Sequence, residues 1–233
     1  MAVSAKQLVL VAVACGGAEI RGKVVDSTGT PLSVAKATIT GSGEATTFSK
    51  PGEIETGGGY RFRDLAPGEY QITLIASGSI QAVIRRVAVR AGGALELPTL
   101  QLALGFFCGA PHESHPAYYR LVKGLPGTGA LSGTILSEHQ QGIAGATLVL
   151  YRRESGRLAV TRTDGDGNFS FRNLPPRSDY RISVSSDGYF TDTLEDMTVQ
   201  ADWDSVYSGV LESCGAGPCE KSVKSFPILA PCG

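Results

Sequence analysis

Apolar and polar residues alternate along most of the chain, in short runs separated by Gly and Pro. In the first half these runs cover residues 20–25, 37–40, 60–63, 70–75 and, more loosely, 82–89. In the second half they cover residues 147–151, 158–163, 168–171, 180–185 and 197–200. A period of two places successive side chains on opposite faces of a strand, so each run predicts a half-buried strand of an antiparallel sheet. No stretch has the period of an amphipathic helix.

The two halves of the chain are copies of one unit. The string TGGGYRFRDLAPGEYQI at residues 56–72 corresponds to TDGDGNFSFRNLPPRSDYRI at residues 163–182. The openings of the copies, IRGKVV at 20–25 and LSGTIL at 131–136, correspond as well. A period of about 110 residues indicates duplicated domains, because the repeats of a solenoid are much shorter.

Short strands at regular spacing with Gly/Pro turns between them are typical of two sheets packed face to face. We therefore predict an all-β fold of two tandem antiparallel β-sandwiches with seven strands each. The predicted boundaries are a leader or donor strand at 1–18, sandwich one at 19–104, a linker containing Cys, Pro and His at 105–128, sandwich two at 129–213, and a Cys-containing tail at 214–233.

Composition and charge narrow the class of protein. The 233 residues include 30 Gly and 12 Pro, and 18% are charged, which fits a turn-rich soluble chain with too many apolar residues for disorder. The net charge is +1 over residues 19–104 and −5 over residues 129–213. Neither copy has the basic surface of a nucleic-acid-binding domain, so nucleic acid is excluded as a partner.

The N-terminus has one Lys, then seven apolar residues at 8–14, then Cys15 and two Gly. This order resembles a short secretory leader, and residues 12–15 resemble a bacterial lipoprotein box with Cys15 as the acylated residue. The alternative is an apolar strand retained in the mature protein. Seven residues are too few for a membrane-spanning helix, which takes about 20. We therefore expect a secreted or cell-surface protein, either extracellular or associated with the outer membrane, that touches a membrane only through a lipid on Cys15.

The remaining cysteines lie outside both copies, in the predicted linker and tail. An even number of cysteines in an exported chain predicts disulfides. Three connectivities are open, and the sequence does not choose among them. The candidates are Cys108, Cys214, Cys219 and Cys232.

The second copy carries a further motif series: GIAGATL at residues 142–148, TDGDGNFSFRNLPP at 163–176 and DYRI at 179–182. This series resembles the carboxypeptidase regulatory-like domain, and the first copy follows the same pattern. The resemblance implies a transthyretin-like or immunoglobulin-like sandwich. It also implies an accessory module of peptidases, receptors or surface proteins, without shared catalytic residues. We therefore expect no enzymatic activity and no cofactor.

Three oxygen-bearing side chains alternate in the turn of the second copy, at Asp164, Asp166 and Asn168, as they do at the start of a calcium loop. A Gly stands at the fourth position of the loop, where an EF-hand needs it at the sixth, and Pro175 replaces the closing Glu. Asp, Gly and Asn are also the residues that tight turns require. We therefore predict a turn at this position and no metal.

His112 and His115 lie three residues apart, with Cys108 four residues upstream. Histidine and cysteine are ligands of zinc and copper, but their spacing here matches no complete metal site. Solvated histidines beside a disulfide would give the same sequence. No Gly-x-Ser-x-Gly elbow or comparable setting activates a serine. We therefore assign no catalytic and no metal-binding residues.

The last third of the second copy is rich in both acidic and aromatic residues. Sugar-binding faces combine stacking rings with carboxylates, and Trp203, between two aspartates, is the residue that we expect to be exposed for a partner. Strands with rings inward and acids outward would have the same composition, because exposed acids are ordinary on sheets. The ligand-binding candidates are Tyr189, Asp202, Trp203, Asp204 and Tyr207.

Three hypotheses for the function follow. The first is a non-catalytic exported surface module for binding or structural spacing, with other surface proteins as partners. The second is a subunit of an extracellular filament, in which residues 7–14 of one copy complete a sheet in a neighbour. The third is carbohydrate or peptide binding through the acidic aromatic region.

Overall fold

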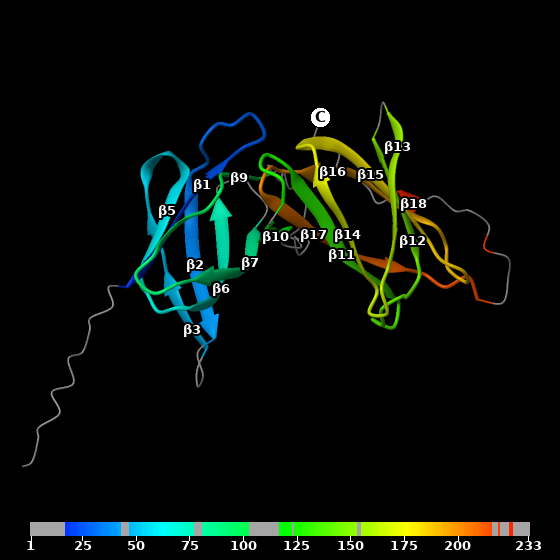
Figure 1. Cartoon of the computed structure of the whole chain (residues 1–233), viewed down its shortest axis with the longest axis horizontal. Coiled ribbons are helices and arrows are strands. Elements are labelled where there is room, and N and C mark those ends of the chain that lie inside the picture. Colours follow the sequence, from blue (N-terminus) through cyan, green and yellow to red (C-terminus); the bar gives the residue numbers. More distant parts are fainter. Residues whose placement is uncertain are drawn as a thin grey trace, which may run out of the picture.

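The computed structural model describes residues 17–42, 47–76, 81–102, 117–122, 124–152, 155–215, 219 and 224–225. These residues form strands and the turns between them, with one three-residue 3₁₀ turn at Thr56–Gly58. Figure 1 shows two β-sandwiches side by side along the long axis of the molecule. The predicted all-β fold of tandem sandwiches is confirmed.

The first sandwich contains two layers. One layer has the strand order β4-β5-β1-β8, with β9 also paired to β1, and the other has the order β3-β2-β6-β7. The strands are β1 (Ala18–Val25), β2 (Val34–Ser42), β3 (Thr47–Pro51), β4 (Glu53–Ile54), β5 (Gly59–Leu65), β6 (Gly68–Ala76), β7 (Ala82–Val89), β8 (Ala94–Glu96) and β9 (Leu100–Gln101).

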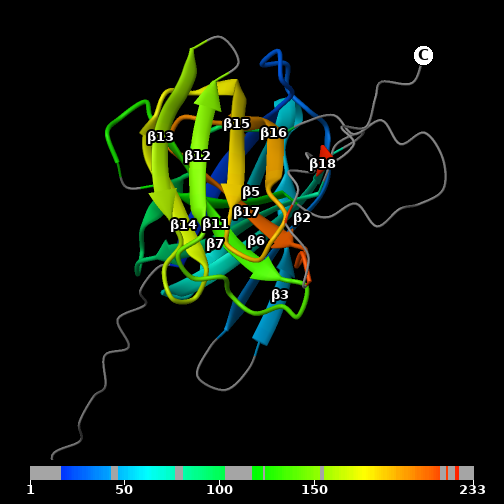
Figure 2. The same ribbon diagram turned by 90° about the vertical axis from the view of Figure 1, so that its right-hand side faces the viewer.

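The second sandwich repeats this layout. One layer has the order β14-β11-β17, and the other has the order β13-β12-β15-β16-β18, which faces the viewer in Figure 2. The strands are β11 (Gly129–Ser137), β12 (Thr147–Arg152), β13 (Gly156–Arg162), β14 (Asn168–Leu174), β15 (Arg177–Ser185), β16 (Asp192–Val199), β17 (Trp203–Leu211) and β18 (Lys224–Ser225).

One eight-stranded sheet joins the two sandwiches, in the order β14-β11-β17-β10-β7-β6-β2-β3. Its connecting strand β10 (Ala117–Leu121) comes from the segment that the sequence predicts as a linker. This strand runs parallel to β7 and antiparallel to β17. The copies are therefore not two separate seven-stranded units but share one continuous layer.

The sheets are mixed, which corrects the expectation of purely antiparallel pairing. Parallel pairs are β1–β8, β1–β9, β10–β7, β11–β17 and β16–β18. The chain crosses to the other layer between β7 and β8 in the first copy and between β16 and β17 in the second, and β8 and β17 each run parallel to the first strand of their copy. Alternation in the sequence reports that a strand is half buried and not which way its neighbour runs.

Both outer sheets pack on the same face of the eight-stranded sheet. Ile84, Tyr119 and Ser205 lie in register on β7, β10 and β17, and Leu131 on β11 continues the row. Ile84 and Tyr119 belong to the core of the first sandwich, whereas Leu131 belongs to the core of the second. The opposite face of this sheet is covered by neither outer sheet, and we call it the open face.

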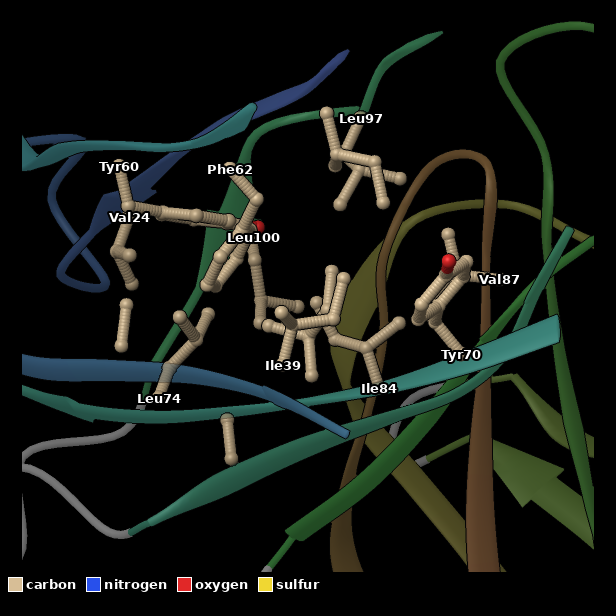
Figure 3. Close-up of a cluster of buried hydrophobic side chains, with 14 of the residues drawn as sticks. Val24, Ile39, Tyr60, Phe62, Tyr70, Leu74, Ile84, Val87, Leu97 and Leu100 are labelled. Atoms are coloured by element: carbon tan, nitrogen blue, oxygen red, sulfur yellow. The ribbon is translucent and has the colours of Figure 1, made fainter. Parts of the chain in front are cut away.

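The cores are built from the alternating residues. In the first sandwich, Tyr60, Phe62, Ile39 and Leu100 fill the space between the layers (Figure 3). Full burial of one such side chain contributes about 1.5–3 kcal/mol. In the second sandwich the corresponding interior is filled by Leu131, Leu148, Leu150, Phe169, Phe171, Tyr180 and Ile182.

A tyrosine fixes the same corner in each copy. The Tyr70 hydroxyl donates to the Ala66 carbonyl at 2.6 Å, and the Tyr180 hydroxyl donates to the Pro175 carbonyl at 2.8 Å. Both rings are buried. An apolar ring with a hydrogen-bonded polar tip is the usual arrangement for a buried tyrosine, so these residues serve the fold.

The repeated turn requires glycine at one position. Gly58 and Gly167 precede the aromatic strands β5 and β14 with φ values of +81° and +82°. A Cβ at Gly58 would lie 2.4 Å from the Val24 carbonyl oxygen, and one at Gly167 would lie 2.4 Å from that of Ile135. Positive φ and this close approach together exclude a side chain, which explains why the turn recurs with glycine.

Candidate functional site

Trp203 lies at the junction between the sandwiches and is completely buried, with 0% exposure. It begins β17 of the second copy, but its ring belongs to the core of the first. The ring packs edge-on against Tyr119, with centroids 6.2 Å apart, and its Nε1 donates to the Thr99 carbonyl at 3.2 Å. The prediction that Trp203 is exposed for a partner is therefore wrong, because β10 places the start of β17 beside the first core.

A pair of glutamines ties the sandwiches together beside this ring. The Gln200 side chain accepts a hydrogen bond from the Gln101 backbone N–H at 2.7 Å and donates one to the Gln101 carbonyl at 2.8 Å. The Gln101 side chain donates in turn to the Asp26 carbonyl at 3.1 Å. The Gln200 amide thus pairs with the backbone of β9 as a neighbouring strand would. Gln200 is itself buried, so these hydrogen bonds are shielded from water.

The other ligand-binding candidates do not gather on one surface. Tyr207 lies on the same face of β17 as Trp203 and packs against the second core, whereas Asp204 points to the open face. Tyr189 lines a hollow of about 910 Å³ at the far end of the second sandwich. Asp202 has a positive φ of 66° in the turn before β17. The rings point inward and the Asp204 carboxylate points outward. This agrees with the interpretation of the region as ordinary strands and not as a sugar-binding face.

The open face carries a hollow of about 310 Å³ over the strands β10, β17, β11 and β14. Its charged groups come from Arg120, Arg172 and Asp204, and the other polar side chains that line it are those of Ser132, Thr134, Asn168 and Ser170. The Ser132 hydroxyl donates to Asp204 Oδ2 at 2.7 Å. Asp204 Oδ1 and Arg120 Nε are buried and have no hydrogen-bond partner within the described part of the chain. The hollow therefore holds unsatisfied groups of both charges.

Burial raises the pKa of the Asp204 carboxyl, against the hydrogen bond from Ser132 and the charges of Arg120 and Arg172, which lower it. Loss of hydration outweighs the attraction because both guanidinium groups lie beyond ion-pair distance, so neither gives the carboxylate a direct partner. The site thus has a carboxylate that would gain from a hydrogen-bond donor.

A third guanidinium extends the basic surface along the open face. Arg85 on β7 stacks over the Tyr118 ring at 4.0 Å from its centroid, which is a cation–π arrangement. Sequence reasoning missed Arg85, Arg120 and Arg172. The available signal was the alternation of AYYRL at residues 117–121, which has the period of a strand although it lies in the predicted linker.

In the acidic turn at residues 164–168, the first carboxylate, that of Asp164, accepts hydrogen bonds from other residues of the same turn. Asp164 Oδ1 accepts the backbone N–H groups of Asp166 at 3.0 Å and Asn168 at 2.8 Å, and Oδ2 accepts the Asn168 side-chain amide at 3.2 Å. The backbone N–H of Asn168 is the main reason why the pKa of Asp164 is lowered. These bonds are those of an Asx-type turn, which supports the turn interpretation of this motif. The structure groups no three His, Cys, Asp or Glu side chains into a metal site within the residues that it describes.

Two of the disulfide candidates are paired. Cys214 and Cys219 form a disulfide with their Cα atoms 5.3 Å apart. Cys15, Cys108 and Cys232 lie outside the described residues, as do the histidines at 112 and 115 and the apolar segment 7–14. Among the described residues no helix is long and apolar enough to cross a membrane.

The arrangement of two copies of one β-sandwich defines the class of protein. The model of the carboxypeptidase regulatory-like domain matches residues 19–103 and 130–211, so the chain belongs to that family and carries the domain twice. No curated protein is significantly similar to the chain.

Among solved structures, the chain resembles the TIE protein of Bacillus anthracis at 15% identity and a TM-score of 0.31, covering 85% of this chain and 34% of that protein. It resembles a minor pilin of Streptococcus agalactiae at 10% identity and a TM-score of 0.32, covering 88% of this chain and 100% of the pilin. A catechol 1,2-dioxygenase of Acinetobacter is matched over 45% of this chain and 58% of the enzyme, at 13% identity and a TM-score of 0.33. The chain thus spans about a third of the length of the TIE protein.

Proposed function

We propose that the chain is a non-catalytic, exported surface module in which two sandwiches act as one stiff spacer. The observation that carries the proposal is the eight-stranded sheet that runs through both copies without interruption. Membership of the carboxypeptidase regulatory-like family supports a module without catalytic residues. The leader-like segment before residue 17 supports export.

The junction makes stiffness the expected property. Domains in one chain usually move relative to each other unless their interface is large and apolar. Here β10 bonds to a strand of each sandwich, Trp203 fills the core of the neighbouring copy, and Gln200 bonds to β9. Bending at the junction would break backbone hydrogen bonds and expose the indole ring. A spacer with this construction keeps its ends at a fixed distance.

Location and stiffness are tested separately. Protease added to intact cells should degrade the protein, and mass spectrometry of the native chain should show processing before residue 17. A protein protected inside the cells would overturn export. Intact Met1 would contradict a cleaved leader, and an unmodified Cys15 would contradict the lipid anchor that the lipoprotein box predicts. Small-angle X-ray scattering should fit one rigid shape, and a Gln200→Ala variant should broaden the distribution of dimensions.

The second candidate function is a filament subunit, and the edge strand β13 favours it. β13 pairs only with β12, so its outer edge is free within the described part of the sheet. Leu158 and Val160 on this strand are 44% and 41% exposed. A long edge strand with exposed apolar side chains is a template for another strand. The apolar segment 7–14 of a neighbouring copy has the composition to pair with it.

Electron microscopy of assembled material tests strand donation. Deletion of residues 1–14 should abolish filaments, and Val160→Lys should do the same because a lysine on an edge strand opposes pairing. The matched control is Ser49→Lys on β3, the equivalent strand of the first copy, which should assemble normally. Normal filaments from the deletion variant would dismiss donation by this segment.

A further inference from the structure

We propose that the hollow on the open face binds a sugar acid, that is, a sugar unit with a carboxylate, with Arg120, Arg172 and Asp204 as its recognition groups. This inference goes beyond the proposed spacer function and does not depend on where the protein resides, because the purified chain is sufficient to test it. The hollow lies on the face that neither outer sheet covers, at the junction of the two copies.

The strand register sets the positions of the charges. Arg85, Arg120 and Asp204 occupy one row across β7, β10 and β17. Neighbouring strands lie about 4.8 Å apart, so the row places Arg120 beside Asp204. Ala130 on β11 continues the row, and Arg172 on β14 lines the hollow from its other side. The carboxylate therefore lies between two guanidinium groups within a single hollow.

The unsatisfied groups define what a ligand must offer. Buried polar atoms are almost always hydrogen-bonded, but Asp204 Oδ1 and Arg120 Nε have no partner among the residues that the structure describes. An ionised carboxylate only accepts hydrogen bonds, and Asp204 Oδ2 already accepts one from Ser132. Oδ1 therefore calls for a hydroxyl or another donor. Guanidinium groups only donate, and their planar fork matches a carboxylate.

A sugar acid supplies both groups within one small unit. Its carboxylate is a partner for Arg120 and Arg172, and its ring hydroxyls are donors for Asp204. The excess of arginine over aspartate along this row favours an anionic ligand although the second sandwich as a whole is acidic. A neutral sugar would offer the guanidinium groups only hydroxyl and ring oxygens, whose hydrogen bonds are weaker than those of a carboxylate. A simple polyanion would bring negative charge to Asp204 without a donor.

Isothermal titration of the full chain with tetragalacturonate tests the proposal, with neutral maltotetraose and the hydroxyl-free peptide tetraglutamate as comparison ligands. We expect measurable binding of tetragalacturonate only. Arg120→Gln and Arg172→Gln should each weaken it about tenfold or more, because a charge-assisted hydrogen bond is lost. The matched control Arg162→Gln removes an exposed arginine on β13, outside the hollow, and should leave binding unchanged.

Asp204→Ala separates sugar recognition from attraction between charges. Removal of this negative charge should weaken tetragalacturonate binding about tenfold if Asp204 accepts a hydroxyl, since a hydrogen bond to a charged group is lost. It should strengthen binding if the hollow only collects anions, and that result would overturn the proposal. Absence of tetragalacturonate binding, or equal binding of tetraglutamate or maltotetraose, would overturn it as well. Thermal unfolding verifies that each variant is folded. If the variants of Arg120 or Asp204 do not fold, Arg172→Gln still tests the proposal, because Arg172 is exposed.

Discussion

Strands β8 and β17 occupy the same place in the two copies but have different neighbours. Both run parallel to the first strand of their copy, with Leu95 opposite Ile20 and Ser205 opposite Leu131. In the described sheets β8 has three residues and pairs only with β1, whereas β17 has nine and also pairs with β10. The register with the first strand is therefore a property of the shared fold. The pairing of β17 with β10 is specific to the junction between the copies.

The residues that differ between these strands are those that build the junction. By the register, Gly93 stands where the second copy has Trp203, and Arg90 stands where it has Gln200. Duplication supplied two equal sandwiches, and side chains present in only one copy joined them. Features that recur therefore report folding, and features that do not recur report how this chain differs from a pair of independent domains.

Trp203→Ala should have the largest effect, because it removes the ring that the second copy places in the first core. We expect a loss of about 3–5 kcal/mol in the free energy of unfolding, as for other buried aromatic residues replaced by Ala. Chemical denaturation measures this loss. Val206→Ala, on the open face of the same strand, is the control and should cost much less. A loss below about 1 kcal/mol for Trp203→Ala would show that the ring does not hold the junction.

Gly167→Ala and Gly58→Ala should destabilise the chain by similar amounts, because these glycines are equivalent in the two copies. Each substitution forces a side chain into positive φ and against a carbonyl oxygen, so we expect about 2 kcal/mol or more from thermal unfolding. Gly165→Ala is the control, since nothing lies within 4 Å of its added Cβ and its φ is not positive. Clearly unequal losses would show that the shared turn does not play the same part in both copies.

The sequence was sufficient for the scaffold because the scaffold recurs. Alternation, the turn glycines and the corner tyrosines each appear twice, and each has a local physical cause. The strand β10 was missed because AYYRL is short and lies between prolines in a segment interpreted as a linker. Its partners, β7 and β17, are distant along the chain, and no local pattern indicates that a strand joins two sheets.

The candidate site could be predicted only in part for the same reason. Asp204 was singled out by composition, but its neighbours Arg120 and Ser132 come from other strands of the shared sheet. Trp203 was misplaced because a tryptophan between two aspartates resembles an exposed residue. Its burial depends on the core of the other copy, which no pattern within residues 129–213 reports.

Asp204→Asn should produce the smallest effect, visible as a dependence of stability on pH. Burial raises the pKa of Asp204 above its ordinary value of 3.8, so the folded chain holds this proton more tightly than the unfolded chain. As pH rises above 3.8 the unfolded chain loses the proton first, and wild-type stability falls. The melting temperature of Asp204→Asn minus that of the wild type, measured from pH 3 to 7, should therefore increase as pH rises.

For Asp164→Asn the same difference should decrease as pH rises. The pKa of Asp164 is lowered in the folded chain, so its carboxylate stabilises the wild type at higher pH, and this contribution is lost as pH falls. Parallel pH profiles for the two variants would contradict the opposite environments of the two carboxylates.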